Sequence, residues 1–198
     1  MSDIRILAKP SSVTWDEVSN VLVEAHKANA SKGFIQNTVN ISGEELKEKV
    51  GLGRCFVAMD GTKVVGTLSV TPKDKIAWFC KGNVLYYMLL GILPSYQGNG
   101  IYSKLIAARE DYARKHHFNV LYMYTAEANH KMQQLAEREG FRLVAYSVSP
   151  KTDYYSVELA KWLDGSPFSE LYCRLRFLLS KYYIKLRYKP GAIKRFCI

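Results

Sequence analysis

The sequence has few features of a metalloprotein or a disulfide-stabilised protein. Its four cysteines are widely separated, and no two have the close spacing of a zinc site or a redox pair: Cys55, Cys80, Cys173 and Cys197. The four histidines are also scattered, and no acidic residue stands at metal-ligand spacing beside the adjacent pair His116 and His117. We therefore expect reduced thiols and no bound metal.

Long apolar runs are missing as well. The most apolar stretch, residues 84–94, has about half the length that a membrane-spanning helix needs, and Gly91 interrupts it. The first five residues already contain Asp3 and Arg5, and no apolar segment of signal-peptide type follows them. These features predict a cytoplasmic protein without a transmembrane segment.

The charge of the chain is concentrated near its end. The 198 residues carry a formal net charge of +10, but residues 1–160 have 19 Lys and Arg against 16 Asp and Glu. Residues 161–198 have 9 against 2 and hold most of the positive charge. We predict one domain over residues 1–160, which is long enough for a well-buried core, and a basic C-terminal extension over residues 161–198.

Hydrophobic periodicity and turn residues predict an α/β fold. Hairpins outnumber strand-helix-strand crossovers, which favours a mixed, largely antiparallel central sheet flanked by helices. The predicted elements are strand 3–8, helix 15–30, helix 42–50, strands 55–59 and 64–70, strand 84–93, helix 101–116, strand 120–125, helix 131–139, and strands 142–148 and 154–159.

A glycine-containing turn follows the strand over residues 84–93. It reads Gln97-Gly98-Asn99-Gly100-Ile101-Tyr102, and a helix begins inside it. Glycines let the backbone turn sharply, while the unpaired N–H groups and the positive dipole end of a helix favour an anion such as a pyrophosphate. The pattern is neither a P-loop nor a complete dinucleotide-binding fingerprint, and a merely structural turn is the alternative.

This segment resembles the acetyl-CoA signature of the GCN5-related N-acetyltransferases, in which Gln or Arg opens a Q/R-x-x-G-x-G/A loop. Farther along the chain, Asn129, Leu135 and Gly140-Phe141 resemble a second pattern of the same family. The resemblance covers residues 4–159. It implies an acetyltransferase that uses acetyl-CoA as co-substrate.

The resemblance also implies which residues bind the co-substrate. Gln97 to Tyr102 would wrap the pyrophosphate, and the backbone at Leu90 and Ile92 would pair with the pantetheine arm. Asn129 would contact the same arm, although a helix cap is its alternative role.

The catalytic groups of the family are only partly present. Ala136 stands where relatives often have a tyrosine acid, and the strand over residues 84–93 contains no carboxylate base. Tyr124 and Glu127, at the end of the next strand, are the preferred proton carriers. Tyr86, Tyr87 and Asp153 are further candidates.

The C-terminal extension predicts a basic amphipathic helix that begins at Ser166-Pro167 and ends at Pro190-Gly191. Its apolar residues recur at spacings of three and four: Phe168, Leu171, Tyr172, Leu175, Leu178, Leu179, Tyr182, Tyr183 and Leu186. The preferred interpretation is that this stripe packs on the enzyme body or on a second subunit in a homodimer. An anionic membrane surface or another acidic partner is the alternative, and no specific nucleic acid is predicted.

These features lead to one functional hypothesis and two rivals. The hypothesis is an N-acetyltransferase that moves an acetyl group from acetyl-CoA directly to a primary amine within a ternary complex. The rivals are a CoA-binding regulatory module with little or no turnover, and a membrane or nucleic-acid binding protein that acts through its basic tail. The sequence does not identify the amine.

Overall fold

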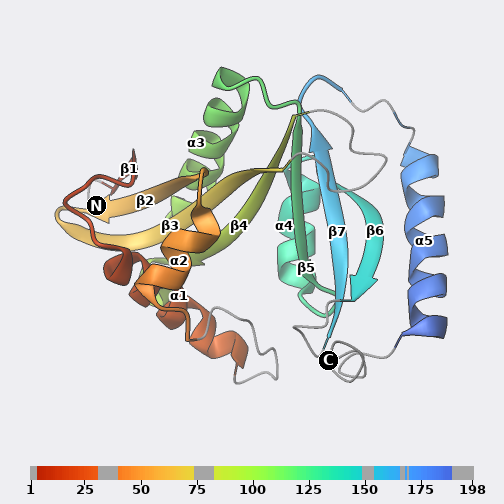
Figure 1. Ribbon diagram of the computed structural model, residues 1–198, viewed down its shortest axis with the longest axis horizontal. Helices are drawn as coiled ribbons and strands as arrows, with labels where there is room; N and C mark the ends of the chain where they lie inside the picture. The colour runs from red at the N-terminus through yellow and green to blue at the C-terminus, as the bar shows by residue number, and fades with distance from the viewer. Residues whose placement is uncertain are drawn as a thin grey trace. The chain divides into compact units, whose positions relative to one another are not determined.

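The computed structural model describes residues 4–30, 40–73, 83–148, 154–165, 168 and 170–188. The chain forms two compact units, residues 1–118 and 119–198, whose helices and strands are labelled in Figure 1. The predicted limits of the tail helix, at Ser166-Pro167 and Pro190-Gly191, lie outside the described residues, as does Asp153.

The first unit contains four antiparallel strands. β1 (Ile4–Ala8), β2 (Arg54–Asp60), β3 (Lys63–Lys73) and β4 (Val84–Ile92) pair in that order. The tight turn between β2 and β3 has Gly61 at φ +58°, a torsion that glycine adopts without steric cost. The strand interiors are largely buried on both faces, which is expected where helices cover both sides of a sheet.

Three helices belong to this unit: α1 (Trp15–Ala30), α2 (Gly43–Val50) and α3 (Ile101–Lys115). α2 begins with a capping box, in which Ser42 and Glu45 each accept a hydrogen bond from the other's backbone N–H. Thr14 and Glu17 make the same reciprocal bonds ahead of α1. These caps satisfy backbone donors that have no partner within the helix and so fix where each helix starts.

Two glycines show how the helices are layered on the sheet. A Cβ at Gly91 of β4 would lie 3.0 Å from the Leu22 side chain of α1, whereas a Cβ at Gly66 of β3 would lie 3.2 Å from Ile101 of α3. Since Gly66 pairs with Ile92, the neighbour of Gly91, the two glycines face opposite sides of the sheet. α1 therefore packs closely on one face and α3 on the other.

The second unit contains a three-stranded antiparallel sheet and two helices. β5 (Val120–Ala126), β7 (Tyr155–Trp162) and β6 (Arg142–Val148) are adjacent in that order. α4 (His130–Arg138) follows β5, and Gly140 at φ +88° ends the turn behind it. β7 runs through Trp162, so the domain boundary predicted at residue 160 falls inside a strand.

α5 (Glu170–Arg187) lies along the outer edge of β6, as Figure 1 shows. The Ser180 hydroxyl accepts a hydrogen bond from the backbone N–H of Tyr146, at 2.9 Å, and Cys173 is buried at the contact. A backbone donor at a strand edge is otherwise open to pairing with another chain. α5 therefore shields the edge of the sheet.

The face of α5 that meets β6 is not the face expected from the sequence. Cys173, Phe177 and Ser180 lie toward the sheet, whereas Leu171, Leu178 and most of the other apolar residues of the predicted stripe are exposed. Most of the predicted stripe is therefore not buried against its own unit, and packing on a second subunit stays a prediction. One side of the helix is held by the sheet and the apolar side faces outward.

None of the described helices has the length and apolar content to cross a bilayer. Within the same residues, no three His, Cys, Asp or Glu side chains are grouped as metal ligands.

Candidate functional site

The loop between β4 and α3 has the backbone geometry of an anion site. A short 3₁₀ turn, Pro94–Tyr96, leads into Gly98 at φ +83° and Gly100 at φ +72°, and Gly100 is the N-cap of α3. A Cβ built at either glycine would meet no atom within 4 Å. The glycines are therefore required by torsion, and the space beside them can admit a ligand.

Three side-chain hydrogen bonds hold this loop in place. Tyr96 donates to Asp60 Oδ2 at 2.9 Å, Gln97 Nε2 donates to the Ile92 carbonyl at 3.2 Å, and Asn99 Nδ2 donates to the Tyr96 carbonyl at 3.4 Å. The hydrogen bond to the Asp60 carboxylate raises the pKa of Tyr96, because it favours the protonated phenol. The loop is thus tied both to the end of β4 and to the turn between β2 and β3.

The first turn of α3 favours negative charge at the same place. Its residues, all of which the structure describes, include no acid. Ile101 is buried beside Gly66 and anchors the turn, Tyr102 is half-buried, and Lys104 Nζ donates to the Ile4 carbonyl at 3.1 Å. The positive end of the helix dipole therefore acts there without an opposing carboxylate.

A β-bulge lies in β4 just before this loop. The register with β3 shifts between Thr67 and Ser69, so two β4 residues, Leu89 and Leu90, lie opposite Leu68. Leu89 has φ +57°, which is unusual for a residue with a branched side chain. A strained torsion of this kind persists only where its surroundings hold it.

His26 of α1 supplies part of that support. Its Nε2 lies 2.8 Å from the Leu90 carbonyl oxygen, and since a carbonyl can only accept, Nε2 carries the proton of this hydrogen bond. The close packing of α1 on Gly91 brings the histidine to the strand. Of the predicted binding positions, the structure therefore places Leu90, Ile92 and residues 97–102 in one continuous segment.

The remaining predicted residues belong to the second unit. Asn129 caps α4 by accepting from the Met132 N–H at 3.2 Å, and its amide donates to Thr125 Oγ1 at 3.2 Å. The helix-cap role weighed from the sequence is thus present. Tyr124, on β5, is about half exposed.

Glu127 is occupied by a network that joins β5, β6 and α5. It accepts a 2.5 Å hydrogen bond from the Tyr146 hydroxyl and ion pairs from Lys181 at 2.9 Å and Lys185 at 3.1 Å. Burial disfavours the carboxylate, but the hydrogen bonds from Tyr146, Lys181 and Lys185 outweigh it and lower the pKa of Glu127 to about 2. Burial and this hydrogen bond raise the pKa of Tyr146.

The other acid–base candidates are enclosed to different degrees. Ala136 is completely buried in α4, so a tyrosine at that position would overpack its surroundings. On β4, Tyr87 is buried and Tyr86 is half-buried under Lys73, whose Nζ lies 6.0 Å from the ring centre.

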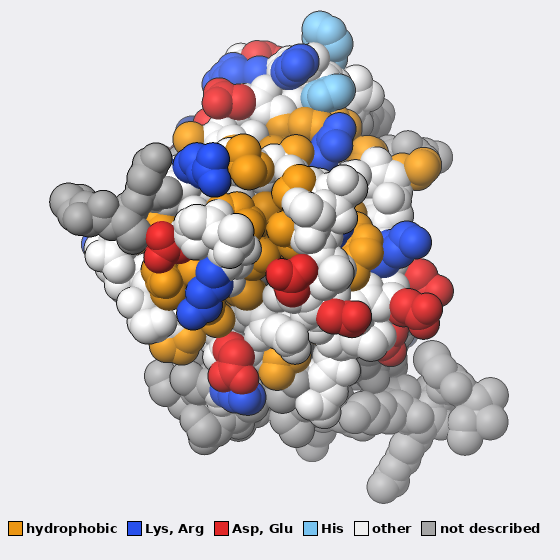
Figure 2. Space-filling model, turned by 90° about the vertical axis from the view of Figure 1, so that its left-hand side faces the viewer, with side chains coloured by type: hydrophobic (Ala, Val, Ile, Leu, Met, Phe, Trp, Pro, Cys, Tyr) orange, Lys and Arg blue, Asp and Glu red, His pale blue; other side chains and the backbone are white. Residues whose placement is uncertain are grey.

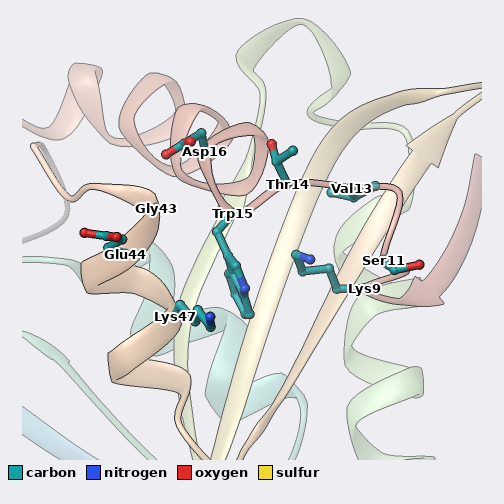
Figure 3. Close-up of a pocket in the computed structure, with 9 residues that line it drawn as sticks. All are labelled: Lys9, Ser11, Val13, Thr14, Trp15, Asp16, Gly43, Glu44 and Lys47. Atoms are coloured by element: carbon teal, nitrogen blue, oxygen red, sulfur yellow. The ribbon is translucent and has the colours of Figure 1, made fainter.

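A cavity of about 360 Å³ opens elsewhere in the first unit, beside the N-termini of α1 and α2 (Figure 3). Its lining includes Trp15, with Lys9 Nζ 4.8 Å from the indole ring, and Asp16, Glu44 and Lys47 from the two helix starts. Both signs of charge line it, and it shares no residue with the loop before α3.

The side of the first unit seen in Figure 2 shows the same mixture on a larger scale. Lys and Arg are interspersed with Asp and Glu around a central apolar area, and neither sign dominates. This agrees with the small excess of positive charge over residues 1–160.

Sequence reasoning did not identify two features of the site. His26 is a single histidine on an amphipathic helix and carries no motif. The bulge at Leu89 depends on register against β3, and a run of apolar residues carries no sign of it. Gly91 is the one local signal, because a glycine inside a strand often marks a bulge or a close approach.

Comparison with known proteins agrees with this geometry. No curated protein matches the chain significantly. Among solved structures, similar folds include a GNAT family acetyltransferase from Elizabethkingia anophelis with acetyl-CoA bound, at 15% identity over 82% of this chain and 100% of that chain, with a TM-score of 0.62. Salmonella typhimurium yncA, solved with its cofactor acetyl-CoA, has 17% identity over 83% and 96% of the two chains and a TM-score of 0.60.

A third similar structure is Arabidopsis thaliana NAA60 in complex with a bisubstrate analogue, at 16% identity over 81% of this chain and 99% of that chain, with a TM-score of 0.60. These likenesses confirm the predicted α/β fold. The sequence profile of the acetyltransferase (GNAT) family matches residues 15–141, which is more than half of the chain. The chain therefore belongs to the acetyltransferase (GNAT) family.

Proposed function

We propose that the protein is an N-acetyltransferase that transfers the acetyl group of acetyl-CoA to a primary amine in a ternary complex. The observation that supports it most is the Gly98–Gly100 loop at the N-terminus of α3. Two positive-φ glycines, open space beside both and a first helical turn without acids fit a pyrophosphate. The structures from Elizabethkingia anophelis and Salmonella typhimurium, solved with acetyl-CoA, share this fold.

In this proposal, Gln97 to Tyr102 wrap the pyrophosphate, and the pantetheine arm pairs with the backbone of Leu90 and Ile92. The bulge at Leu89 supports this assignment, because it interrupts the regular ladder of β4 next to those residues. The resemblance in sequence also makes Asn129 a candidate for contact with the arm, and in the structure its side chain caps α4.

The proposed chemistry is a direct acyl transfer. A neutral amine nitrogen attacks the thioester carbonyl and forms the amide carbon–nitrogen bond, and the carbon–sulfur bond breaks. The nitrogen gives up one proton, the thiolate takes up one, and CoA leaves as the free thiol. A backbone N–H near Ile92 stabilises the oxyanion, and positioning of the two substrates supplies much of the rate.

We propose Tyr124 as the proton carrier, since its side chain is about half exposed on β5. Glu127 is a weaker candidate for the base, because its pKa of about 2 makes the carboxylate a poor proton acceptor at neutral pH. Glu127 would act instead by fixing the end of β5 next to Tyr124.

A CoA-binding module with little turnover is the second candidate function. β4 contains no carboxylate over its whole described length, Ala136 is buried, and Glu127 is engaged by two lysines. Each of these removes a group that a proton-transfer step could use.

One experiment separates the two functions. Calorimetry measures acetyl-CoA binding, and a thiol-reactive dye follows CoA release across a panel of primary amines. The proposal predicts binding together with amine-dependent thiol release that Tyr124→Phe reduces. Binding without release for any amine would favour the module, and absence of binding would contradict both.

A further inference from the structure

The outward side of α5 carries an apolar surface that the fold of the second unit leaves open. Six large side chains form it, each between 52% and 77% exposed: Leu171, Leu175, Leu178, Leu179, Tyr182 and Leu186. They recur at intervals of three and four residues along the 18-residue helix, so they share one side of it. We call these six residues the α5 stripe.

The stripe and the contact with β6 lie on opposite sides of the helix. At about 100° per residue, Cys173, Phe177 and Ser180 fall roughly half a turn away from Leu171, Leu175 and Leu178. Because Ser180 and Cys173 hold one side against β6, the helix cannot rotate to bury the stripe on the same strand. Figure 1 shows β6 beside α5, and no other described element of this unit lies on the outer side of the helix.

Positive charge borders the stripe on both sides. Around the helix, Arg174, Lys181 and Lys185 flank one margin, and Arg176 and Arg187 flank the other. Glu170 is the one acid in α5 and forms an ion pair with Arg174 at 2.7 Å. Over residues 161–198 the sequence has 9 Lys and Arg against 2 acids, so the whole extension is cationic.

We propose that the α5 stripe binds an anionic membrane surface, with the helix lying in the plane of the interface. Leucines would enter the boundary between headgroups and acyl chains, while long cationic side chains at the margins reach anionic headgroups. Tyr182 has the apolar ring and polar hydroxyl that suit the interface. The sheet of the second unit would then stand on the side of α5 away from the lipid.

Charge favours a membrane over a second copy of the chain. Each α5 has five Lys and Arg and one Glu, and Glu127 pairs with Lys181 and Lys185, so pairing two stripes would bring together two helices that each keep a net positive charge. Like charges at the margins of such an interface oppose association, whereas anionic lipid neutralises the same groups. This inference is independent of acetyl transfer, because it uses no residue of the loop, the bulge or β5.

The test is co-sedimentation of the full chain with phosphatidylcholine vesicles, with and without about one third phosphatidylglycerol. Leu175→Ser/Leu178→Ser removes the centre of the stripe, and Leu52→Ser is the matched control, because Leu52 is 96% exposed in the first unit. Arg174→Gln/Arg187→Gln removes one cation from each margin. Melting temperature and molar mass in solution are measured for every variant.

The proposal predicts binding to anionic vesicles that is at least about tenfold stronger than to neutral vesicles and that weakens with salt. The double serine variant should lose about tenfold or more in partitioning, with an unchanged melting temperature, and Leu52→Ser should bind as the parent does. The double glutamine variant should show a smaller preference for anionic lipid, because seven Lys and Arg remain against two acids over residues 161–198.

Three results would overturn the proposal. One is absence of vesicle binding by the intact chain. Another is anionic binding that survives Leu175→Ser/Leu178→Ser, which would indicate a purely electrostatic acidic partner. The third is a dimer that the serine variant dissociates while no vesicles bind, which would assign the stripe to a second copy.

Discussion

Gly98 and Gly100 have torsions that side chains with a Cβ rarely adopt, and neither glycine is forced by a lack of space. At the residue scale, a substitution at either glycine therefore has two separate effects, backbone strain and added charge, and the two can be varied independently. Asn and Asp both tolerate positive φ better than other residues and are nearly equal in shape. The pair therefore isolates charge at one position.

Gly100→Asp should weaken acetyl-CoA binding at least about tenfold more than Gly100→Asn, because its carboxylate would oppose phosphate at the dipole end of α3. Calorimetry on both variants, with melting temperatures to confirm folding, measures the difference. Gly165→Asp, at φ +92° outside the loop, controls for strain alone. Equal acetyl-CoA affinities of the Asn and Asp variants would show that no phosphate group binds at this loop.

We expect His26 to act through strand β4, to which it is hydrogen-bonded, rather than on a substrate. Its hydrogen bond to the Leu90 carbonyl supports a bulge in which Leu89 has φ +57°. His26→Ala should lower kcat about tenfold or more with a smaller change in the KM for acetyl-CoA, since misplacement of the strand affects the oriented complex most. His26→Gln, which keeps a donor, should recover part of kcat.

Lys27→Ala is the control for His26, because Lys27 is the next residue of α1 and is exposed. A lower melting temperature of His26→Ala without a change in kcat would show that His26 has only a structural role. Equal kcat in the Ala and Gln variants would show that the hydrogen bond is not what matters.

At the scale of elements, α5 is attached to the strands of the second unit through Glu127. Lys181 and Lys185 reach the carboxylate from the helix, and Tyr146 reaches it from β6. The folded state lowers the pKa of Glu127 from its ordinary value of 4.5 to about 2. Between these values the unfolded chain binds more protons, so stability falls as the pH falls.

Glu127→Gln should therefore be less stable than the parent near neutral pH, by about 1 kcal/mol or less because solvent screens these exposed pairs. The contribution is fully present above about pH 4.5 and is lost as the pH falls through about 2, so the two stabilities should converge over that interval. Urea unfolding at a series of pH values measures the gap.

The control for this prediction is Lys181→Met/Lys185→Met, which keeps the apolar stems and removes both cations. In that background, Glu127→Gln should lower the free energy of unfolding by less than it does in the parent. The change in this difference between neutral and acidic pH should also be smaller. Stability curves that stay parallel down to pH 2 would show that the ion pairs do not stabilise the fold.

Element positions were largely predictable because their signals are local. The helix predicted over residues 15–30 is α1, and the capping pattern at Ser42 and Glu45 marks the start of α2. Gly140, at φ +88°, marks the end of the α4 turn. Caps and periodicity need only neighbouring residues, so one sequence contains them.

The features that escaped prediction depend on distant parts of the chain. Lys185 is 58 positions from Glu127, and the bulge at Leu89 exists only against β3. Periodicity predicted an amphipathic tail helix, but the polar Ser180, not the apolar stripe, makes the hydrogen bond to β6. Pairing over long separations decides such contacts, and no local pattern encodes it.

At the scale of the whole molecule, charge and apolar exposure both increase toward the C-terminus. Residues 161–198 hold 9 of the 28 Lys and Arg, and α5 holds most of the highly exposed leucines of the described chain. The first unit contains the loop and the bulge, whereas the second contains α5. Binding of acetyl-CoA and the role of the tail can therefore be tested separately.

Truncation after Asp164 keeps all of β7, which ends at Trp162, and removes α5 from the edge of β6. The truncation removes the contacts that Phe177 and Cys173 make on the side of α5 facing β6. It also removes the Ser180 hydroxyl that accepts the hydrogen bond of the Tyr146 N–H. Burial of one large apolar side chain contributes about 1.5–3 kcal/mol, and each kcal/mol shifts Tm by about 2–4 °C, so Tm should fall by about 3–12 °C.

The same truncation should leave the Kd for acetyl-CoA within about twofold of the parent at temperatures well below Tm, because the loop before α3 lies in the first unit. Leu175→Ser/Leu178→Ser is the matched comparison, since it alters only the exposed side of α5 and should preserve Tm. Scanning calorimetry and titration of both proteins give the two quantities. An unchanged Tm after truncation would mean that α5 does not stabilise β6. Loss of acetyl-CoA binding after truncation would mean that the binding site needs the tail.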